Sequence, residues 1–305
     1  MDGNALRRIA AKASLGLALF LTLLKLAAAI ATGSLAILTS LIDSLADIVA
    51  SAITWFSVRV SQQPPDRTHR FGHGKAESLS ALAQAALVSG TALFVLIEAV
   101  QRFIEPVAMR ASTIGYSVMA VAIVLTFVLV AFQRHVIRRT GSKAIAADSL
   151  HYSADLMTNV AVLVSIWGSS TLGWTWVDPI TALLIASYLL YHAVAIGRGA
   201  VDVLMDHELS GDKREAIKRI ISHHPAVEDL HDLRTREAGS TQFIEMHIEL
   251  DGEMTVNEAH KVTDALESEL FRAFPDAEVI IHQEPAGIED ARLDHVIAGR
   301  TREGV

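Results

Sequence analysis

The sequence predicts a membrane α-helical protein, with a six-transmembrane-helix bundle followed by a small soluble α+β domain. Hydrophobic residues make up 51% of the 305 residues, and the mean hydropathy is +0.36, as is typical of a chain partly embedded in lipid. After residue 205 the long apolar runs give way to amphipathic and alternating patterns. We therefore expect a transmembrane domain at 1–205, a soluble domain at 206–285 and a disordered tail at 286–305.

Six apolar runs define the membrane domain, and each is near the length of about 20 residues that a spanning helix needs. Turn-forming residues separate them, with Gly33 in the first break, Pro64 and Pro65 in the second, and Pro106 in the third. The first run follows basic residues but is too long for a signal peptide, so we interpret it as a retained helix. The runs cover residues 13–31, 34–58, 78–101, 112–133, 143–168 and 177–200.

Basic residues are concentrated on one side of the predicted bundle. The opposite side carries only Arg102 and Arg110. Because lysine and arginine mark the cytoplasmic side, we expect both termini and the soluble domain to be cytoplasmic. The residues on the cytoplasmic side are Arg7, Arg8, Lys12, Arg59, Arg67, Arg70, Lys75, Arg134, Arg138, Arg139 and Lys143.

The soluble domain has an αββαβ pattern, which predicts a ferredoxin-like fold. Helical periodicity covers 212–223 and 256–274, and strand patterns cover 227–236, 241–250 and 278–282. In the second strand, Ile244, Met246, Ile248 and Leu250 alternate with polar residues and with Phe243, so one face is expected to pack under the helices.

Charge and cysteine content restrict the function. From residue 202 onward the chain has 24 acidic and 11 basic residues, which favours attraction of cations and argues against nucleic-acid binding. The chain has no cysteine, so any metal must be held by His, Asp and Glu. Such ligands suit Zn²⁺ or Fe²⁺ better than Cu⁺.

Two predicted membrane helices each carry a pair of potential metal ligands four residues apart. The second run has Asp43 and Asp47, and the fifth has His151 and Asp155. This spacing places each pair on one helix face, and ionisable groups at membrane depth usually mark a substrate path. Alternatively, each residue only satisfies a neighbouring helix. Asp148 lies one turn before His151, as a further ligand near the membrane edge or as part of a helix start.

Two further clusters lie outside the predicted membrane helices. Asp66, His69 and His73 fall within eight residues of one loop, where a solvated surface role is the alternative. The soluble domain contributes five more candidates, of which some are expected to be unliganded surface groups. They are His231, His247, His260, His282 and Glu284.

Taken together, these motifs resemble the cation diffusion facilitators, most closely the bacterial zinc and ferrous-iron efflux type. The resemblance rests on the D-x-x-x-D and H-x-x-x-D pairs, F-G-H-G-K-A-E at 71–77, H-D-L-R-T-R at 231–236 and I-I-H-Q at 280–283. It covers about residues 9–285. It implies a homodimer that exports divalent metal in exchange for protons and is not an enzyme.

The resemblance also assigns roles to the candidate residues. Lys75 and Asp206 match a charged pair that joins the two membrane halves. Glu284 stands where relatives usually have a bridging aspartate, which puts the spacing of that site in doubt. The transport site corresponds to Asp43, Asp47, His151 and Asp155; the loop site to Asp66, His69 and His73; and the cytoplasmic binuclear site to His231, His247, His260 and His282.

Competition between metal and protons for these ligands gives a physical basis for antiport, because the ligands must be deprotonated to bind metal. Zn²⁺ is expected as substrate and as regulatory ion. Asp43 replaces a histidine of some zinc-selective relatives, so Fe²⁺, Cd²⁺ and Co²⁺ are further candidates. Two rival hypotheses are an intramembrane hydrolase, for which the sequence lacks an H-E-x-x-H motif, and a metal sensor that binds without transport.

Overall fold

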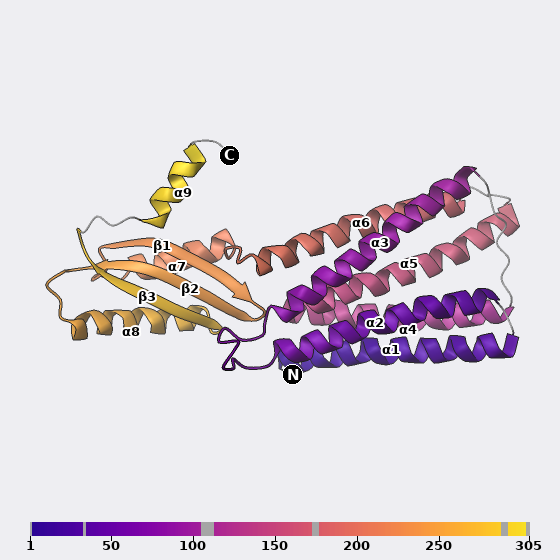
Figure 1. Ribbon diagram of the computed structural model, residues 1–305, viewed down its shortest axis with the longest axis horizontal. Coiled ribbons are helices and arrows are strands. Elements are labelled where there is room, and N and C mark those ends of the chain that lie inside the picture. Colours follow the sequence, from indigo (N-terminus) through magenta and orange to yellow (C-terminus); the bar gives the residue numbers. More distant parts are fainter. Residues whose placement is uncertain (1, 33–34, 105–112, 173–176, 288–291, 303–305) are drawn as a thin grey trace. The chain divides into compact units, whose positions relative to one another are not determined.

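A computed structural model describes residues 2–32, 35–104, 113–172, 177–287 and 292–302. The chain forms two compact units, Met1–Val201 and Asp202–Val305. The first is built from long helices and the second from a small sheet with shorter helices (Figure 1). Each unit is considered on its own below.

The membrane unit contains long helices, each of which extends beyond its predicted apolar run at the C-terminal end. Among the described residues, four helices are long and apolar enough to cross a membrane, over Gly3–Ile30, Ala76–Gln101, Ser117–Thr140 and Pro179–Leu204. The chain is therefore an integral membrane protein. The helix bounds are α1 Gly3–Thr32, α2 Leu35–Ser61, α3 Ala76–Ile104, α4 Thr113–Thr140, α5 Lys143–Leu172 and α6 Val177–Leu204.

Helices α2 and α5 both include residues whose side chains are not described, and the four spans refer to the described residues alone. Helix α5 packs against α1, α2, α3 and α4, and α1 also packs against α2 and α4. Small residues such as Ala10, Ala11 and Ala147 are buried at these contacts and allow close approach of the helices. Polar side chains of α2 and α5, including Ser51 and Thr54, are buried within the unit. The two helices thus direct polar residues toward protein.

A buried charged network joins the helices at one end of this unit. Arg7 Nη1 lies 3.2 Å from Glu77 Oε1, and Arg7 Nη2 donates to the carbonyl oxygen of Thr140 at 3.1 Å. The hydroxyl groups of Ser61 and Ser142 donate to the same carboxylate. The network ties α1, α2 and α3 to the turn between α4 and α5.

The soluble unit has a three-stranded sheet with the order β1-β2-β3. Strand β1 pairs antiparallel with β2, and β3 pairs parallel with β2. Ile244, Met246 and Ile248 are buried on the face that packs against α7 and α8, as the alternation predicts. The bounds are α7 Gly211–Ser222, β1 Asp229–Ala238, β2 Thr241–Leu250, α8 Val256–Ala273 and β3 Ala277–Pro285. The αββαβ order therefore agrees with the sequence prediction, and β3 is longer than predicted because its pairing with β2 continues to Pro285.

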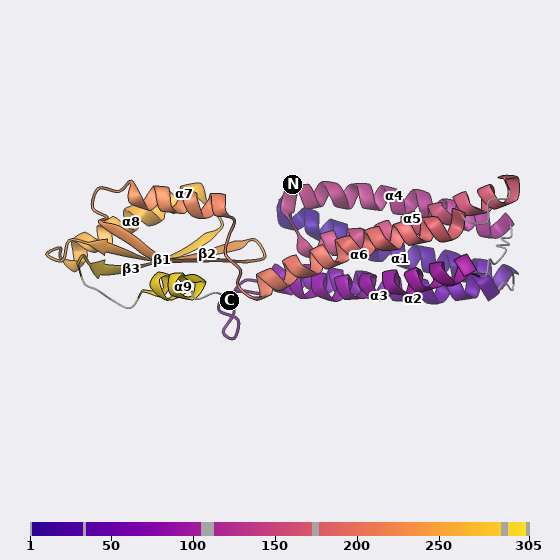
Figure 2. The same ribbon diagram turned by 90° about the horizontal axis from the view of Figure 1, so that it is seen from above.

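The prediction of a disordered tail from residue 286 does not hold for residues 293–302. They form helix α9, Leu293–Arg302, which contacts β1. Figure 2 shows α7 and α8 on one side of the sheet and α9 on the other. A β-bulge between His231 and Arg234 takes Asp232 out of the ladder, and the Asp232 carboxylate accepts the N–H groups of Leu293 and Asp294 at 2.9 Å each. Residues 293–302 can form a helix because this distant aspartate caps its first turn.

Candidate metal centres

A cluster of three ligand-type side chains joins α2 and α5. His151 Nε2 lies 3.0 Å from Asp47 Oδ1 and 3.9 Å from Asp155 Oδ2. The four-residue spacing on α5 stacks His151 and Asp155 on one helix face, and α2 supplies Asp47 opposite them. All three side chains are half-buried, so an ion could reach them and still be largely shielded from solvent. Asp43 lies on α2, and its side chain is outside the described part of the structure.

Buried neighbours hold the imidazole of this cluster in place. The ring of Tyr152 meets the His151 ring edge-on, with centroids 5.7 Å apart. The Tyr152 hydroxyl donates to the carbonyl oxygen of Ser14 at 3.0 Å and lies 2.8 Å from the Ser51 hydroxyl. Because Tyr152 is anchored at both α1 and α2, it limits the movement of the α5 turn that carries His151.

Asp148 belongs to a separate polar network. Its carboxylate accepts from Gln133 Nε2 at 2.7 Å and from Thr54 Oγ1 at 3.4 Å, and it is fully buried. Gln133 Nε2 also donates to Ser14 Oγ at 2.9 Å. Since α5 begins at Lys143, a helix-start role for Asp148 is excluded. Among the described residues Asp148 is also in no metal-competent cluster, so it pairs with helices α2 and α4 instead.

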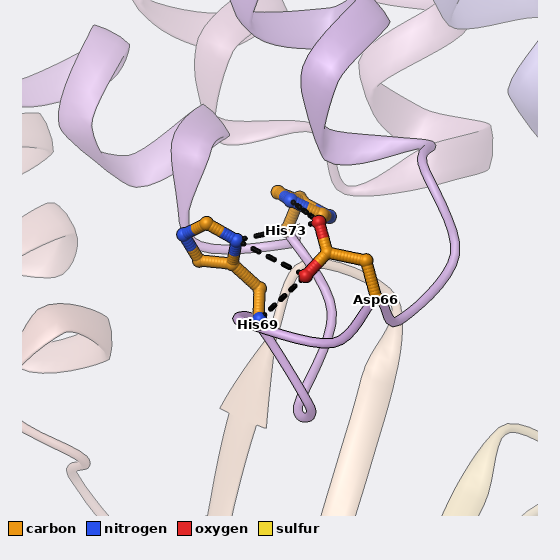
Figure 3. Close-up of side chains that lie close together, drawn as sticks. All are labelled: Asp66, His69 and His73. Atoms are coloured by element: carbon orange, nitrogen blue, oxygen red, sulfur yellow. Dashed lines mark hydrogen bonds and ion pairs between the residues drawn. The ribbon is translucent and has the colours of Figure 1, made fainter.

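The loop between α2 and α3 brings Asp66, His69 and His73 together, with the carboxylate facing both imidazoles (Figure 3). Asp66 Oδ1 lies 3.4 Å from His69 Nδ1, and Asp66 Oδ2 lies 3.4 Å from His73 Nε2. The ring centroids of the two histidines are 4.6 Å apart. Gly72 has a φ of 76°, which allows the chain to turn back between the two histidines.

Backbone N–H groups organise the carboxylate of this loop. The N–H of His69 donates to Asp66 Oδ1 at 2.6 Å, and the N–H and hydroxyl of Thr68 donate to the same oxygen at 2.8 and 2.9 Å. These bonds hold the pKa of Asp66 far below its usual range, the N–H of His69 having the largest effect. Asp66 is therefore an anion that is already oriented for a cation.

On the face of the sheet opposite α7 and α8, one carboxylate faces two histidines from different strands. Glu284 on β3 has Oε1 2.7 Å from His247 Nδ1 on β2, and Oε2 3.1 Å from His231 Nε2 on β1. The strand register explains this, because His231 lies opposite His247 and His247 lies opposite His282. Burial raises the pKa of Glu284, but the hydrogen bond from His247 and the nearby imidazoles outweigh it and lower the pKa overall.

The remaining two residues of the predicted cytoplasmic site lie at its edge or apart from it. His282 Nε2 is 3.6 Å from Glu284 Oε1, but its side chain is 63% exposed. His260 lies on α8, where it pairs with its helix neighbour Asp264 at 3.7 Å. Within the described chain, His260 is in none of the clusters whose ligand atoms converge. For His260 to be a ligand in the same site as His247 and Glu284, it would have to come from a second copy of the chain.

The charged pair predicted between Lys75 and Asp206 stays a prediction, because the two residues belong to different units. Within the soluble unit, Arg236 Nη1 donates to Asp206 Oδ1 at 3.4 Å. Sequence reasoning also missed three groups beside His231: Asp229, Glu249 and Arg292, which form an ion-pair network. No local motif marks them, since they come from β1, β2 and the tail.

Comparisons with known proteins agree over most of the chain. Residues 11–205 match the family model of the cation efflux transmembrane domain, and residues 209–286 match that of the cation efflux protein cytoplasmic domain. The cation-efflux pump FieF of Shewanella oneidensis is 45% identical over 282 residues, which are 92% of this chain and 95% of the relative. FieF of Escherichia coli K12 is 45% identical over 279 residues, 92% of this chain and 93% of the relative. Among solved structures, the metal-bound C-terminal domain of the CzcD transporter from Thermotoga maritima is 38% identical over 26% of this chain and 93% of that chain, with a TM-score of 0.25.

Proposed function

Because the chain belongs to the cation efflux family, the cation diffusion facilitators, we propose that it exports Zn²⁺ across the cell inner membrane in exchange for protons. Fe²⁺, Cd²⁺ and Co²⁺ are secondary substrates in this proposal, since carboxylates and imidazole bind all of these ions. The observation that carries it is the convergence of Asp47, His151 and Asp155 between α2 and α5. Asp43, one turn from Asp47 on α2, is proposed as the fourth ligand.

The ligand chemistry supports antiport. Three carboxylates that meet at membrane depth repel one another unless a dication or protons neutralise them. Metal and protons therefore compete for the same oxygen and nitrogen atoms, and metal leaves when protons arrive from the other side. His151 is the proposed proton-sensitive ligand, because imidazole is the side chain that titrates nearest to neutral pH.

The wider arrangement follows from the family. We propose that all six long helices span the membrane, with both termini and the soluble unit in the cytoplasm, and that the chain works as a homodimer. Asp66, His69 and His73 would capture cytoplasmic metal at the loop. His231, His247, His260, His282 and Glu284 would bind regulatory metal between two copies of the soluble domain. The two oxygens of Glu284 already face different histidines, which supports a bridging role despite its extra methylene.

The experiment is metal uptake into proteoliposomes under an imposed pH gradient. Purified full-length protein should accumulate Zn²⁺ inside vesicles that are acidic within, and collapse of the gradient should stop it. Asp47→Asn or Asp155→Asn should lower the initial rate by about tenfold or more, because each removes a charged ligand that metal binding requires. Glu269→Gln, a change of an exposed carboxylate on α8, is the control and should leave the rate unchanged.

Three other results of this experiment would contradict different parts of the proposal. Transport by Asp47→Asn and Asp155→Asn at the control rate would overturn the site assignment. Metal binding without any flux would favour the sensor hypothesis over the exporter. Zn²⁺ flux that does not depend on the pH gradient would support export but contradict exchange for protons.

A further inference from the structure

A second set of ligands lies on the other side of His231. Asp229 on β1, Glu249 on β2 and His231 place ligand atoms within 4.8 Å of one another. His231 Nδ1 lies 3.8 Å from Glu249 Oε1 and, in the described part of the chain, is buried without a hydrogen-bond partner. The His231 side chain is only 5% exposed. Because buried polar atoms are normally satisfied, this nitrogen indicates a ligand that the two carboxylates would share.

In the structure, Arg292 of the tail forms ion pairs with these two carboxylates. Arg292 Nη1 donates to Asp229 Oδ2 at 2.9 Å, and Arg292 Nη2 donates to Glu249 Oε1. One guanidinium thus bridges two strands and supplies the positive charge that a metal ion would otherwise supply. It does not satisfy His231 Nδ1, because the described contacts of Arg292 end at the two carboxylates.

The start of α9 fixes Arg292 in this position. The residues that follow it, Leu293 and Asp294, donate their N–H groups to the Asp232 carboxylate at 2.9 Å. In return, the N–H of Asp232 donates to Asp294 Oδ2 at 2.9 Å. Asp232 can do this because the bulge frees it from the ladder and its φ is 50°. The tail is therefore docked by reciprocal bonds next to the arginine.

His231 belongs to both clusters, so metal bound to it in one cluster opposes metal binding in the other. Its Nε2 faces Glu284 at 3.1 Å, and its Nδ1 faces Glu249 at 3.8 Å. A neutral imidazole that binds metal through one nitrogen carries its proton on the other. Metal on the Glu284 side therefore makes Nδ1 a donor toward Glu249, and metal on the Glu249 side makes Nε2 a donor toward Glu284.

We propose that Asp229, His231 and Glu249 form a further divalent-cation site, and that Arg292 closes it while α9 is docked. One imidazole nitrogen and two carboxylate oxygens are a donor set that suits Zn²⁺, with a fourth position left for water. A dication that enters this site displaces the guanidinium, and α9 loses the ion pairs that hold its first turn. The tail thereby directs metal to the Glu284 side of His231. This inference does not rest on transport, because it concerns equilibrium binding.

The test measures zinc binding to the full-length protein in detergent by isothermal titration calorimetry. All variants share a background with Asp155→Asn, His73→Ala and His247→Ala, which removes one ligand from each of the other three clusters. In the background, zinc must displace Arg292 to enter the site, so adding Arg292→Gln should raise the affinity for one Zn²⁺ per chain by about tenfold or more, a usual size for coupling between sites. Arg272→Gln changes an exposed arginine of α8 and is the control.

Removal of a proposed ligand completes the test. This gain in affinity should disappear on Asp229→Asn, an exposed position at which the fold is expected to tolerate the change. Hydrogen exchange of residues 293–302 should rise when zinc saturates the background protein, as α9 is released. The proposal is overturned if Arg292→Gln leaves the zinc affinity unchanged, if the gain in affinity survives Asp229→Asn, or if saturating zinc leaves α9 exchange unchanged.

Discussion

At the residue scale, spacing within a helix predicted more than the chemical type of single residues did. The four-residue interval between His151 and Asp155 places both side chains on one face of α5, and Asp47, which is expected from the second run, lies beside His151 in the structure. The same logic could not predict the surroundings of Asp148. Its partners Gln133 and Thr54 come from α4 and α2, and their positions depend on how three helices pack.

The Asp148 network leads to the first prediction. Gln133→Leu removes the amide that donates to Asp148 at 2.7 Å and leaves a buried carboxylate short of a partner. An unsatisfied buried polar group costs about 1–3 kcal/mol, so the variant should melt at a lower temperature in detergent. Adding Asp148→Leu to Gln133→Leu should recover part of this loss, because both polar partners are then gone. Equal melting of the single variant and the wild type would show that the Gln133 bond contributes nothing.

The ligands around His231 show where residue-level prediction fails. His231, His247 and Glu284 could be assigned to one sheet face from strand alternation and from the family resemblance. Asp229 and Glu249 follow the same alternation, but many acidic residues do so in an acidic domain. Only the contact with Arg292 distinguishes them, and that residue lies in a tail whose sequence has no strand pattern and few apolar positions.

At the element scale, the predicted helices and strands of the soluble domain agree with the structure to within a few residues. The patterns that define them are local: periodicity in α7 and α8, and alternation in β2. Helix α9 could not be predicted in this way, because its first N–H groups are satisfied by Asp232, about sixty positions earlier in the chain. A helix whose cap is supplied by tertiary contact has no sequence signature at its own start.

Arg7 and Glu77 give an element-scale prediction for the membrane unit. Their side chains are only 10% and 3% exposed, so Arg7→Met leaves a buried carboxylate without its counter-charge. Breaking one partner of a buried pair typically costs about 3–5 kcal/mol, and we expect a large drop in melting temperature in detergent. Arg8→Met, a change of the exposed neighbour, is the matched control. The double variant Arg7→Met with Glu77→Met should be more stable than Arg7→Met alone; if it is less stable, charge burial is not the cause.

Helix α8 provides a prediction with a defined pH dependence. Thr255 and Glu258 form a capping box, in which each side chain accepts the backbone N–H of the other residue. Thr255→Ala should lower the stability of the soluble unit by about 1 kcal/mol, seen as faster hydrogen exchange at the start of α8 in the full-length protein. Ser268→Ala, on the exposed side of the same helix, is the control.

The bonds from Thr255 lower the pKa of Glu258 below its ordinary value of 4.5. The ionised box therefore contributes stability above the ordinary glutamate pKa, and this contribution is lost as the pH falls through the lower, folded-state pKa. Protection at the start of α8 should weaken in that acidic range in the wild type, and Glu258→Gln should remove the pH dependence. A pH dependence that survives Glu258→Gln would mean that another group controls it.

At the scale of the whole molecule, hydropathy identifies a membrane domain but does not locate its chemistry. Within the described residues, four helices meet the hydropathy criterion, and the cluster of Asp47, His151 and Asp155 lies on α2 and α5, parts of which are not described. The site is recognised instead by its ionisable side chains, which are costly at membrane depth and therefore mark a substrate path. The family matches, which cover residues 11–205 and 209–286, supply what hydropathy alone does not.

The final prediction concerns the proposed homodimer. If metal bound at His247 and Glu284 recruits His260 from a second copy, zinc should draw two soluble domains together, because a ligand that binds only the joined state shifts the equilibrium toward it. The chain has no cysteine, so Glu269→Cys gives a unique site for a spin label on the exposed side of α8. Zinc should shorten and narrow the distance distribution between labels in the full-length protein, and a chelator should reverse the change.

Two variants identify the metal that controls this response. His247→Ala should abolish it, because the cytoplasmic cluster is impaired. Asp155→Asn should keep it, because only the membrane cluster is impaired and the cytoplasmic one is intact. If Asp155→Asn abolishes the response and His247→Ala does not, the controlling metal binds at the membrane cluster.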